Sequence, residues 1–83
     1  MYKILILPSA TKDLDDLPSK ELIRIKEKIF PLSENPRPWG SVKLIKEEGY
    51  RLRSGDYRIL YRVDDKNKAI YIYRLKHRRE AYK

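Results

Sequence analysis

Apolar and polar residues follow two different periods along this chain of 83 residues. In residues 19–33 the apolar positions have the spacing of one face of an α-helix: Leu22, Ile25, Ile29 and Leu32, with Ile23 and Phe30 widening the stripe. From Tyr50 onward the period changes to two, which is the period of a half-buried strand. The chain is therefore expected to form helices in its first half and strands in its second.

The remaining elements follow from short apolar runs and their breakers. Residues 2–7 are rich in Ile and Leu and stop at Pro8, which predicts a buried first strand. Ser9 is a candidate N-cap for a short helix that stops near Leu17, and Pro18 suits the first turn of the next helix. Late in that second helix, Pro31 should loosen the last turn.

The second half reads as a hairpin followed by one more strand. Residues 50–53 and 57–63 alternate on either side of the turn at residues 54–56, and residues 69–75 follow the polar turn at 64–68. The stretch "SENPRPWG" is the loop that joins the two halves. The order β-α-α-β-β-β predicts an α+β fold, with an antiparallel-dominated four-stranded sheet and two N-terminal helices packed on one of its faces.

Size and composition limit how that sheet can be covered. At 10.0 kDa the chain is a single domain over residues 1–83, because neither half could bury its own core. Hydrophobic residues make up 41% of the chain and charged residues 39%, which suffices for helices on one side of the sheet only. The other face should meet water or a ligand.

The net charge of +8 lies almost wholly in the second half. Residues 1–48 hold nine Lys/Arg and eight Asp/Glu, whereas residues 49–83 hold eleven and four. This imbalance indicates a polyanionic partner, with nucleic acid favoured over a membrane because no basic amphipathic helix carries the excess. The chain has no cysteine, no run long enough to span a bilayer and no signal-peptide pattern, so a cytoplasmic location is expected.

Four arginines concentrate this charge on the predicted hairpin. Arg51 and Arg53 share one face of the first strand, and Arg58 and Arg62 project from the same face of the second. Such a face is either an ordinary solvated surface or a site for an anion. The planar guanidinium fork, which suits bidentate phosphate binding, favours the second interpretation.

The C-terminal stretch "RLKHRREAYK" adds further candidates. The chain's one histidine, His77, lies between Lys76 and the pair Arg78 and Arg79, and Tyr82 follows. A lone histidine is usually structural or solvated, and without a second histidine or a cysteine it does not indicate a metal site. No P-loop, Gly-rich fingerprint or Ser-His-Asp arrangement is present, so no cofactor is expected.

Together, "YRLRSGDYRILYRV" and "AIYIYRLKHRREAYK" resemble the core of the RelE/ParE superfamily of toxins from toxin–antitoxin modules, and "ATKDLDDLP" with the helix ending in "SENPRP" resembles its helical hairpin. The "GDYR…Y…HRREAY" pattern looks more like the RelE branch of messenger-RNA endonucleases than the ParE branch of gyrase inhibitors. The resemblance covers nearly the whole chain.

The resemblance implies an endoribonuclease that works in the ribosomal A site. Members of that branch cut the messenger without a metal, by attack of a ribose 2′-OH on the adjacent phosphorus. Arg58 matches the family arginine that stabilises the phosphate, and Arg51 falls where some members carry a basic catalytic lysine. Tyr82 matches the C-terminal tyrosine that stacks on or positions a base. The remaining basic residues are expected to bind RNA: Arg53, Arg62, Arg74, Lys76, Arg78, Arg79 and Lys46.

The chain also departs from the family pattern. Where well-studied members carry two lysines before the turn, this sequence has Gly49 and Arg51, and arginine is a poor general base. His77 is then the candidate acid or base, with Arg78 or Arg79 as a cation near the leaving group. Lys46 could replace a lost lysine from the preceding segment.

Two kinds of partner and two other functions follow from the same resemblance. The expected partners are an acidic RelB-like antitoxin, which would complement the basic half, and the ribosome with its messenger. The first alternative is a ParE-like DNA gyrase inhibitor without nuclease chemistry. The second is an attenuated toxin that mainly binds its antitoxin, which the missing lysines would favour.

Overall fold

The computed structural model describes residues 1–77. In chain order the elements are β1 (Lys3–Ile6), α1 (Pro8–Asp15), α2 (Ser19–Ile29), the 3-10 helix η1 (Phe30–Ser33), β2 (Val42–Lys43), β3 (Tyr50–Ser54), β4 (Tyr57–Asp64) and β5 (Ala69–His77). No helix in this part of the chain is long and apolar enough to cross a membrane.

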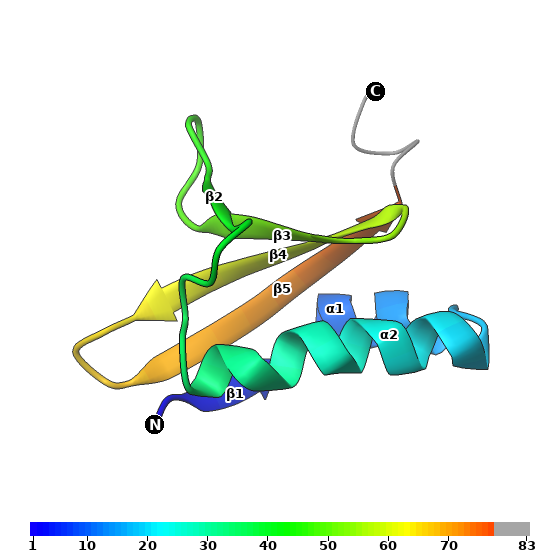
Figure 1. Cartoon of the computed structure of the whole chain (residues 1–83), viewed down its shortest axis with the longest axis horizontal. Helices are drawn as coiled ribbons and strands as arrows, with labels where there is room; N and C mark the ends of the chain where they lie inside the picture. The colour runs from blue at the N-terminus through cyan, green and yellow to red at the C-terminus, as the bar shows by residue number, and fades with distance from the viewer. Residues whose placement is uncertain (78–83) are drawn as a thin grey trace.

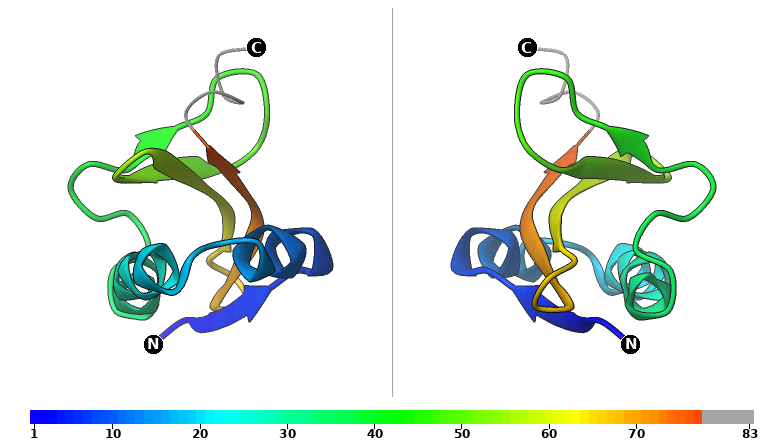
Figure 2. Two further views of the ribbon diagram at one scale, coloured as in Figure 1. Left: turned by 90° about the vertical axis from the view of Figure 1, so that its right-hand side faces the viewer. Right: turned by 90° about the vertical axis from the view of Figure 1, so that its left-hand side faces the viewer.

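The strands form one sheet in the order β1-β5-β4-β3-β2, in which only the β1–β5 pair is parallel. Both helices lie on the same side of this sheet, whereas the loop after β2, the strand at the far edge, extends away from the helices (Figures 1 and 2). The predicted α+β class and helix placement are confirmed. The predicted four strands are wrong by one, because β2 is too short for an alternating pattern to reveal it.

The core lies between the helices and one face of the sheet. On α2 and η1 the buried side chains are Ile25, Ile29 and Leu32, which belong to the predicted stripe. Ile23 and Phe30 are about 60% exposed (58% and 60%), so the wider apolar face expected from the sequence is wrong. The helix does loosen at Pro31, which lies in η1, as its missing N–H predicts.

The first strand is an edge strand and not the buried one that its apolar sequence suggested. β1 pairs only with β5, and Leu5 and Ile6 remain 37% and 38% exposed. A strand with one neighbour is covered on fewer sides than a central strand. The apolar run therefore predicted the strand correctly, but its burial was predicted wrongly.

β1 pairs with β5 only as far as Ile72, and beyond that point α1 lies along the same edge of β5. The Ser9 hydroxyl donates to the Tyr73 carbonyl (2.6 Å), and the Asp13 carboxylate accepts from the Leu75 N–H (2.9 Å). Side chains thus satisfy the backbone groups that an edge strand would leave unpaired. Ser9 is consequently not the N-cap that the sequence suggested; that position belongs to Leu7.

Candidate nucleic-acid interface

Three cationic side chains form a row across the sheet face that the helices leave uncovered. Arg53 on β3 lies directly opposite Arg58 on β4, and Arg58 lies directly opposite Lys76 on β5. We call Arg53, Arg58 and Lys76 the cation row. Like charges directly opposite each other destabilise a sheet, and an anion bound between them relieves the repulsion. The row therefore has the charge pattern of a phosphate site.

Two adjacent hollows flank Arg51 and Arg58, which line both of them. The first, which we call the arginine hollow, has a volume of about 230 Å³; its lining residues are Gly40, Val42, Arg51, Arg53 and Arg58. The second, the Glu47 hollow, has a volume of about 190 Å³; its lining residues are Leu44, Glu47, Arg51, Arg58, Leu60 and Lys76. The structure thus brings together three predicted arginines and Lys76.

The loop between β2 and β3 closes one side of this surface. It brings Leu44 and Glu47 beside Leu60 of β4. Leu60 is almost fully buried, although it points to the same face of the sheet as Arg58. The loop returns to β3 through Gly49, whose carbonyl accepts from the Leu44 N–H (2.9 Å). The carboxylate of Glu47 consequently lies in the same hollow as Arg58, and a carboxylate there can accept a proton.

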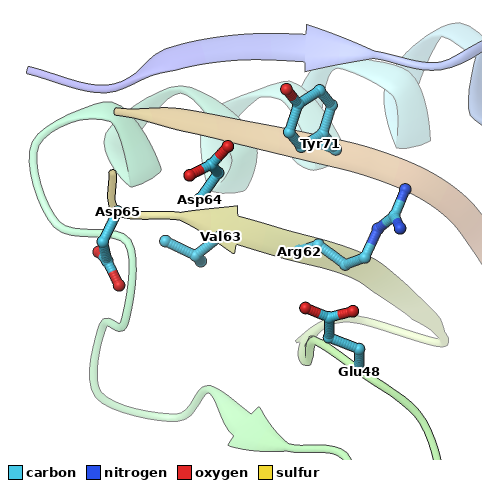
Figure 3. A pocket seen from close by; sticks show the side chains of 6 residues that line it. All are labelled: Glu48, Arg62, Val63, Asp64, Asp65 and Tyr71. Atoms are coloured by element: carbon cyan, nitrogen blue, oxygen red, sulfur yellow. The ribbon is translucent and has the colours of Figure 1, made fainter. Parts of the chain in front are cut away.

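Arg62 belongs to a different part of the same face. Its guanidinium lies over the rings of Tyr71 and Tyr73, 5.9 and 5.6 Å from their centroids. It also lines a separate hollow of about 420 Å³ that includes Glu48 and Asp64 (Figure 3). Aromatic rings and carboxylates thus surround Arg62, whereas Arg58 shares its two hollows with Arg51, Arg53, Lys76 and Glu47.

Two more predicted RNA-binding residues lie away from the cation row. Arg74 donates from Nε to the Asp13 carboxylate (2.9 Å), so its head group is held against α1 at the β5 edge. Lys46 is exposed on the loop between β2 and β3. Neither residue lines the arginine hollow or the Glu47 hollow.

His77 lies on the opposite side of the sheet from Arg58. It faces Tyr57 across the β4–β5 pair, and the two rings meet edge to face with centroids 5.1 Å apart. Tyr57 packs against the core, and Lys76, the neighbour of His77, is the residue opposite Arg58. Because successive side chains alternate across a strand, His77 and the cation row are separated by the sheet. The structure therefore does not join the predicted acid or base to the predicted phosphate site.

Three predicted site residues, Arg78, Arg79 and Tyr82, lie outside the described residues. Conversely, the structure adds Gly40, Val42 and Glu47 to the surface around Arg58. Gly40 and Glu47 come from the irregular segments on either side of β2, and Val42 from that two-residue strand, so no hydrophobic period indicates which of their side chains face the sheet. The sequence offered one signal here, the Pro and Gly in "PWG". They predict a turn, but they do not indicate where that turn lies relative to the sheet.

An ion pair fixes the loop that precedes β2. The Arg37 guanidinium donates to both carboxylate oxygens of Asp65 (2.8 and 3.3 Å) and from Nε to the Tyr50 hydroxyl (2.8 Å). The Tyr2 hydroxyl donates to the same carboxylate (2.5 Å). The hydroxyl of the fully buried Tyr61 donates to the Pro36 carbonyl (2.8 Å). The loop is thus attached to β3 and to the second half of β4, and the Asp65 carboxylate that it binds also holds Tyr2.

This ion pair predicts a loss of stability in acid. Hydrogen bonds from Arg37 and then Tyr2 lower the pKa of Asp65 from 3.8 to about 2. A carboxylate whose folded pKa is depressed stabilises the fold above its unfolded pKa, and the contribution disappears as pH falls through the folded pKa. We expect the free energy of unfolding, measured in urea, to fall more steeply between about pH 4 and pH 2 in the wild type than in Asp65→Asn.

The control for this measurement is Asp15→Asn, which removes one carboxylate from the exposed part of α1 without touching the ion pair. It separates the loss of the Arg37–Asp65 contact from a change in net charge. Parallel pH profiles for the wild type and Asp65→Asn would show that the pair contributes nothing to folding.

Comparison with known proteins agrees with this fold. A family model described as the ParE toxin of the type II toxin-antitoxin system, parDE, matches residues 4–82. Toxin RelG of Mycobacterium tuberculosis is 33% identical over 99% of this chain and 97% of its own length, and the putative toxin RelE1 of Methanocaldococcus jannaschii is 36% identical over 99% and 96%. A chain of the toxin-antitoxin complex RelBE2 from Mycobacterium tuberculosis superposes with a TM-score of 0.82 at 34% identity, covering 93% of this chain and 98% of that one. The chain therefore belongs to the RelE/ParE family, the toxins of type II toxin–antitoxin modules.

Proposed function

We propose that this toxin is a ribosome-dependent endoribonuclease that cuts messenger RNA in the A site and so arrests translation. The observation that carries the proposal is the cation row, in which Arg58 lies between Arg53 and Lys76 at the boundary of two hollows. Attack of a ribose 2′-OH on phosphorus concentrates negative charge on the non-bridging oxygens, and fixed cations stabilise that charge.

Within this proposal Arg58 binds the reacting phosphate, and Arg51 and Arg53 hold it or the next phosphate from β3. The guanidinium forks can each donate two parallel hydrogen bonds to a phosphate, which fixes its orientation as well as its charge. The surface is an open sheet face, not an enclosed cleft. We therefore expect the ribosome to supply orientation for the messenger, and cleavage of RNA outside the ribosome to be slow.

The proton transfers need groups other than arginine. Glu47 and Lys76 line the Glu47 hollow together with Arg58, so we assign to them the exchange of protons with a substrate bound there. His77, on the helix side of the sheet, would need a rearrangement at the end of β5 to take part. Tyr82 keeps its proposed role of stacking on a base, which aromatic rings perform well with unstacked RNA.

The test is translation of a defined messenger in a purified ribosomal system, with the 5′ ends of the RNA mapped after the toxin is added. Cuts confined to A-site codons, and slow cutting of the same RNA without ribosomes, are the expected results. Intact messenger with unimpaired translation at stoichiometric toxin would contradict the proposal.

A second candidate is a toxin that binds its target or its antitoxin without nuclease chemistry, as a ParE-like gyrase inhibitor or an attenuated toxin would. The observation that favours it is the position of the chain's one histidine on the face away from Arg58. DNA damage with uncut messenger would support gyrase inhibition, and neither effect would support the attenuated toxin.

For either function we propose an acidic, RelB-like antitoxin as a protein partner. The solved relative from Mycobacterium tuberculosis is a toxin–antitoxin complex, and the second half of this chain carries eleven Lys/Arg against four Asp/Glu. An acidic segment that folds as it binds would match this charge.

A further inference from the structure

The chain's one tryptophan is fully exposed beside the proposed phosphate site. Trp39 has a relative exposure of 101%, and two nearby apolar side chains, Val42 and Ile45, are 44% and 98% exposed. Folded proteins bury most of the area of their tryptophans, because the indole ring is one of the largest apolar surfaces a residue can remove from water. An indole left wholly in solvent is therefore a candidate contact for a ligand.

The backbone that carries this indole is nevertheless well fixed. The Ser41 N–H donates to the Pro38 carbonyl (3.0 Å), and Gly40 has φ of +98°, which together fit a type II turn with Trp39 at its second position. Arg37, just before this turn, is held by Asp65 and Tyr50. A ring presented on an ordered turn binds with less loss of conformational freedom than one on a loose loop.

The turn also forms part of the arginine hollow. Gly40, whose Cα is about 3.8 Å from that of Trp39, lines this hollow together with Arg51, Arg53 and Arg58. Apart from its two chain neighbours, no atom lies within 4 Å of the position that a Cβ on Gly40 would occupy, so the space beside this turn is open. The turn that carries the exposed ring thus adjoins the proposed phosphate-binding surface.

We propose that Trp39 stacks on an unstacked base of single-stranded RNA whose phosphate lies in the arginine hollow. This inference rests on the proposed function, because it adds a base-binding subsite to the same surface. A nucleotide combines a flat ring with an anionic group one sugar away, which is the pairing of chemistry that the turn and the hollow present. An acidic peptide would satisfy the arginines and leave the indole face without an equivalent partner.

The intrinsic fluorescence of the protein tests the contact directly, because Trp39 is the only tryptophan. The probes are a short oligouridylate and an abasic sugar–phosphate oligomer of the same length and charge. Stacking predicts that the oligouridylate quenches the fluorescence, whereas the abasic oligomer binds more weakly and leaves it nearly unchanged. Equal responses to the two probes would mean that no base reaches the indole, and would overturn the proposal.

Variants then test whether the contact matters for binding and cleavage. Base stacking on one aromatic ring predicts a loss of affinity of roughly 5- to 100-fold in Trp39→Ala, with most affinity kept in Trp39→Phe. The effect should appear in KM more than in kcat. Ile45→Ala is the matched control, since Ile45 is equally exposed on the neighbouring loop and lines neither hollow.

The outcomes separate this inference from the proposed function. A-site cleavage by Trp39→Ala with the wild-type KM overturns the stacking role and leaves the endonuclease intact. If the wild-type toxin does not cut messenger, the proposed function fails, and the fluorescence titration still decides whether RNA bases contact Trp39. Stronger quenching by an acidic peptide than by the oligouridylate would assign the indole to a protein partner and overturn the RNA subsite.

Discussion

Replacing Arg58 with alanine is expected to reduce A-site cleavage by at least about 100-fold, which is the loss measured when one donor to a developing oxyanion is removed. Arg58 lies between Arg53 and Lys76 and lines both hollows, so it is the cation best placed to touch the phosphate from two sides. The effect should fall mainly on kcat, because charge builds up on the phosphate in the transition state. Arg58→Lys should recover part of the rate, since lysine supplies the charge without the bidentate fork.

Arg62→Ala provides the matched control for Arg58→Ala. It removes the same charge from the same strand and face, yet its guanidinium lies over Tyr71 and Tyr73 and not beside the cation row. Cleavage by this variant should stay within a few-fold of wild type. Equal losses in the two variants would mean that the face acts only through its total charge, and wild-type cleavage by Arg58→Ala would place the phosphate elsewhere. Circular dichroism of each variant is the check that the fold is kept.

The arginine face is the part of the site that the sequence predicts best. Side chains on one strand alternate strictly, so the spacing of Arg51, Arg53 and Arg58 around a short turn is enough to place them on one face. The composition also indicates which face, because 41% hydrophobic residues cannot cover both. The first of these conclusions depends on the alternation of side chains along a strand, and the second on the overall composition. Both can be read from a single sequence.

Other positions depend on contacts between distant parts of the chain, which no local pattern reveals. The Arg74 head group is turned away by Asp13, a residue of α1 that is 61 positions earlier. The β4–β5 register shifts between Leu60 and Tyr61, so Arg74 lies opposite Leu60 and Ile72 opposite Tyr61. An extra residue in one strand changes which side chains meet, and it leaves no hydrophobic signal of its own.

His77 shows the same limit in a different way. The family resemblance and the missing lysines suggested that it is the acid or base, but strand alternation places it with Tyr57 on the helix side. The prediction treated the end of the strand as an irregular tail, whereas β5 continues through His77. The strand is two residues longer than predicted, and its regular alternation puts the imidazole on the face opposite Lys76.

Gly49 is the position where a single methyl group should cost most stability. It is buried at the start of β3 with φ of +119°, and a Cβ there would lie 2.5 Å from the Tyr61 carbonyl oxygen and 3.2 Å from Cγ of Arg62. The oxygen is backbone and cannot rotate away, so β3 and β4 would have to separate. They would do so where Tyr50 pairs with Tyr61, whose rings stack 5.8 Å apart.

Gly49→Ala is therefore expected to lower the free energy of unfolding by about 3 kcal/mol, combining the cost of a left-handed backbone with that of overpacking. A loss of that size should lower Tm by about 12 to 24 °C in a domain of this length.

Gly55→Ala is the control for this substitution. The φ of +59° at Gly55 strains any side chain, but no atom lies within 4 Å of the added Cβ. This variant should therefore lose only about 1 to 2 kcal/mol of unfolding free energy. Thermal and urea unfolding of both variants measure the difference, and equal losses would show that the β3–β4 contact at Tyr61 yields at little cost. If the larger loss is found, the close approach at Gly49 stabilises the β3–β4 pair that carries Arg51, Arg53 and Arg58, and the toxin's activity should fall with its stability.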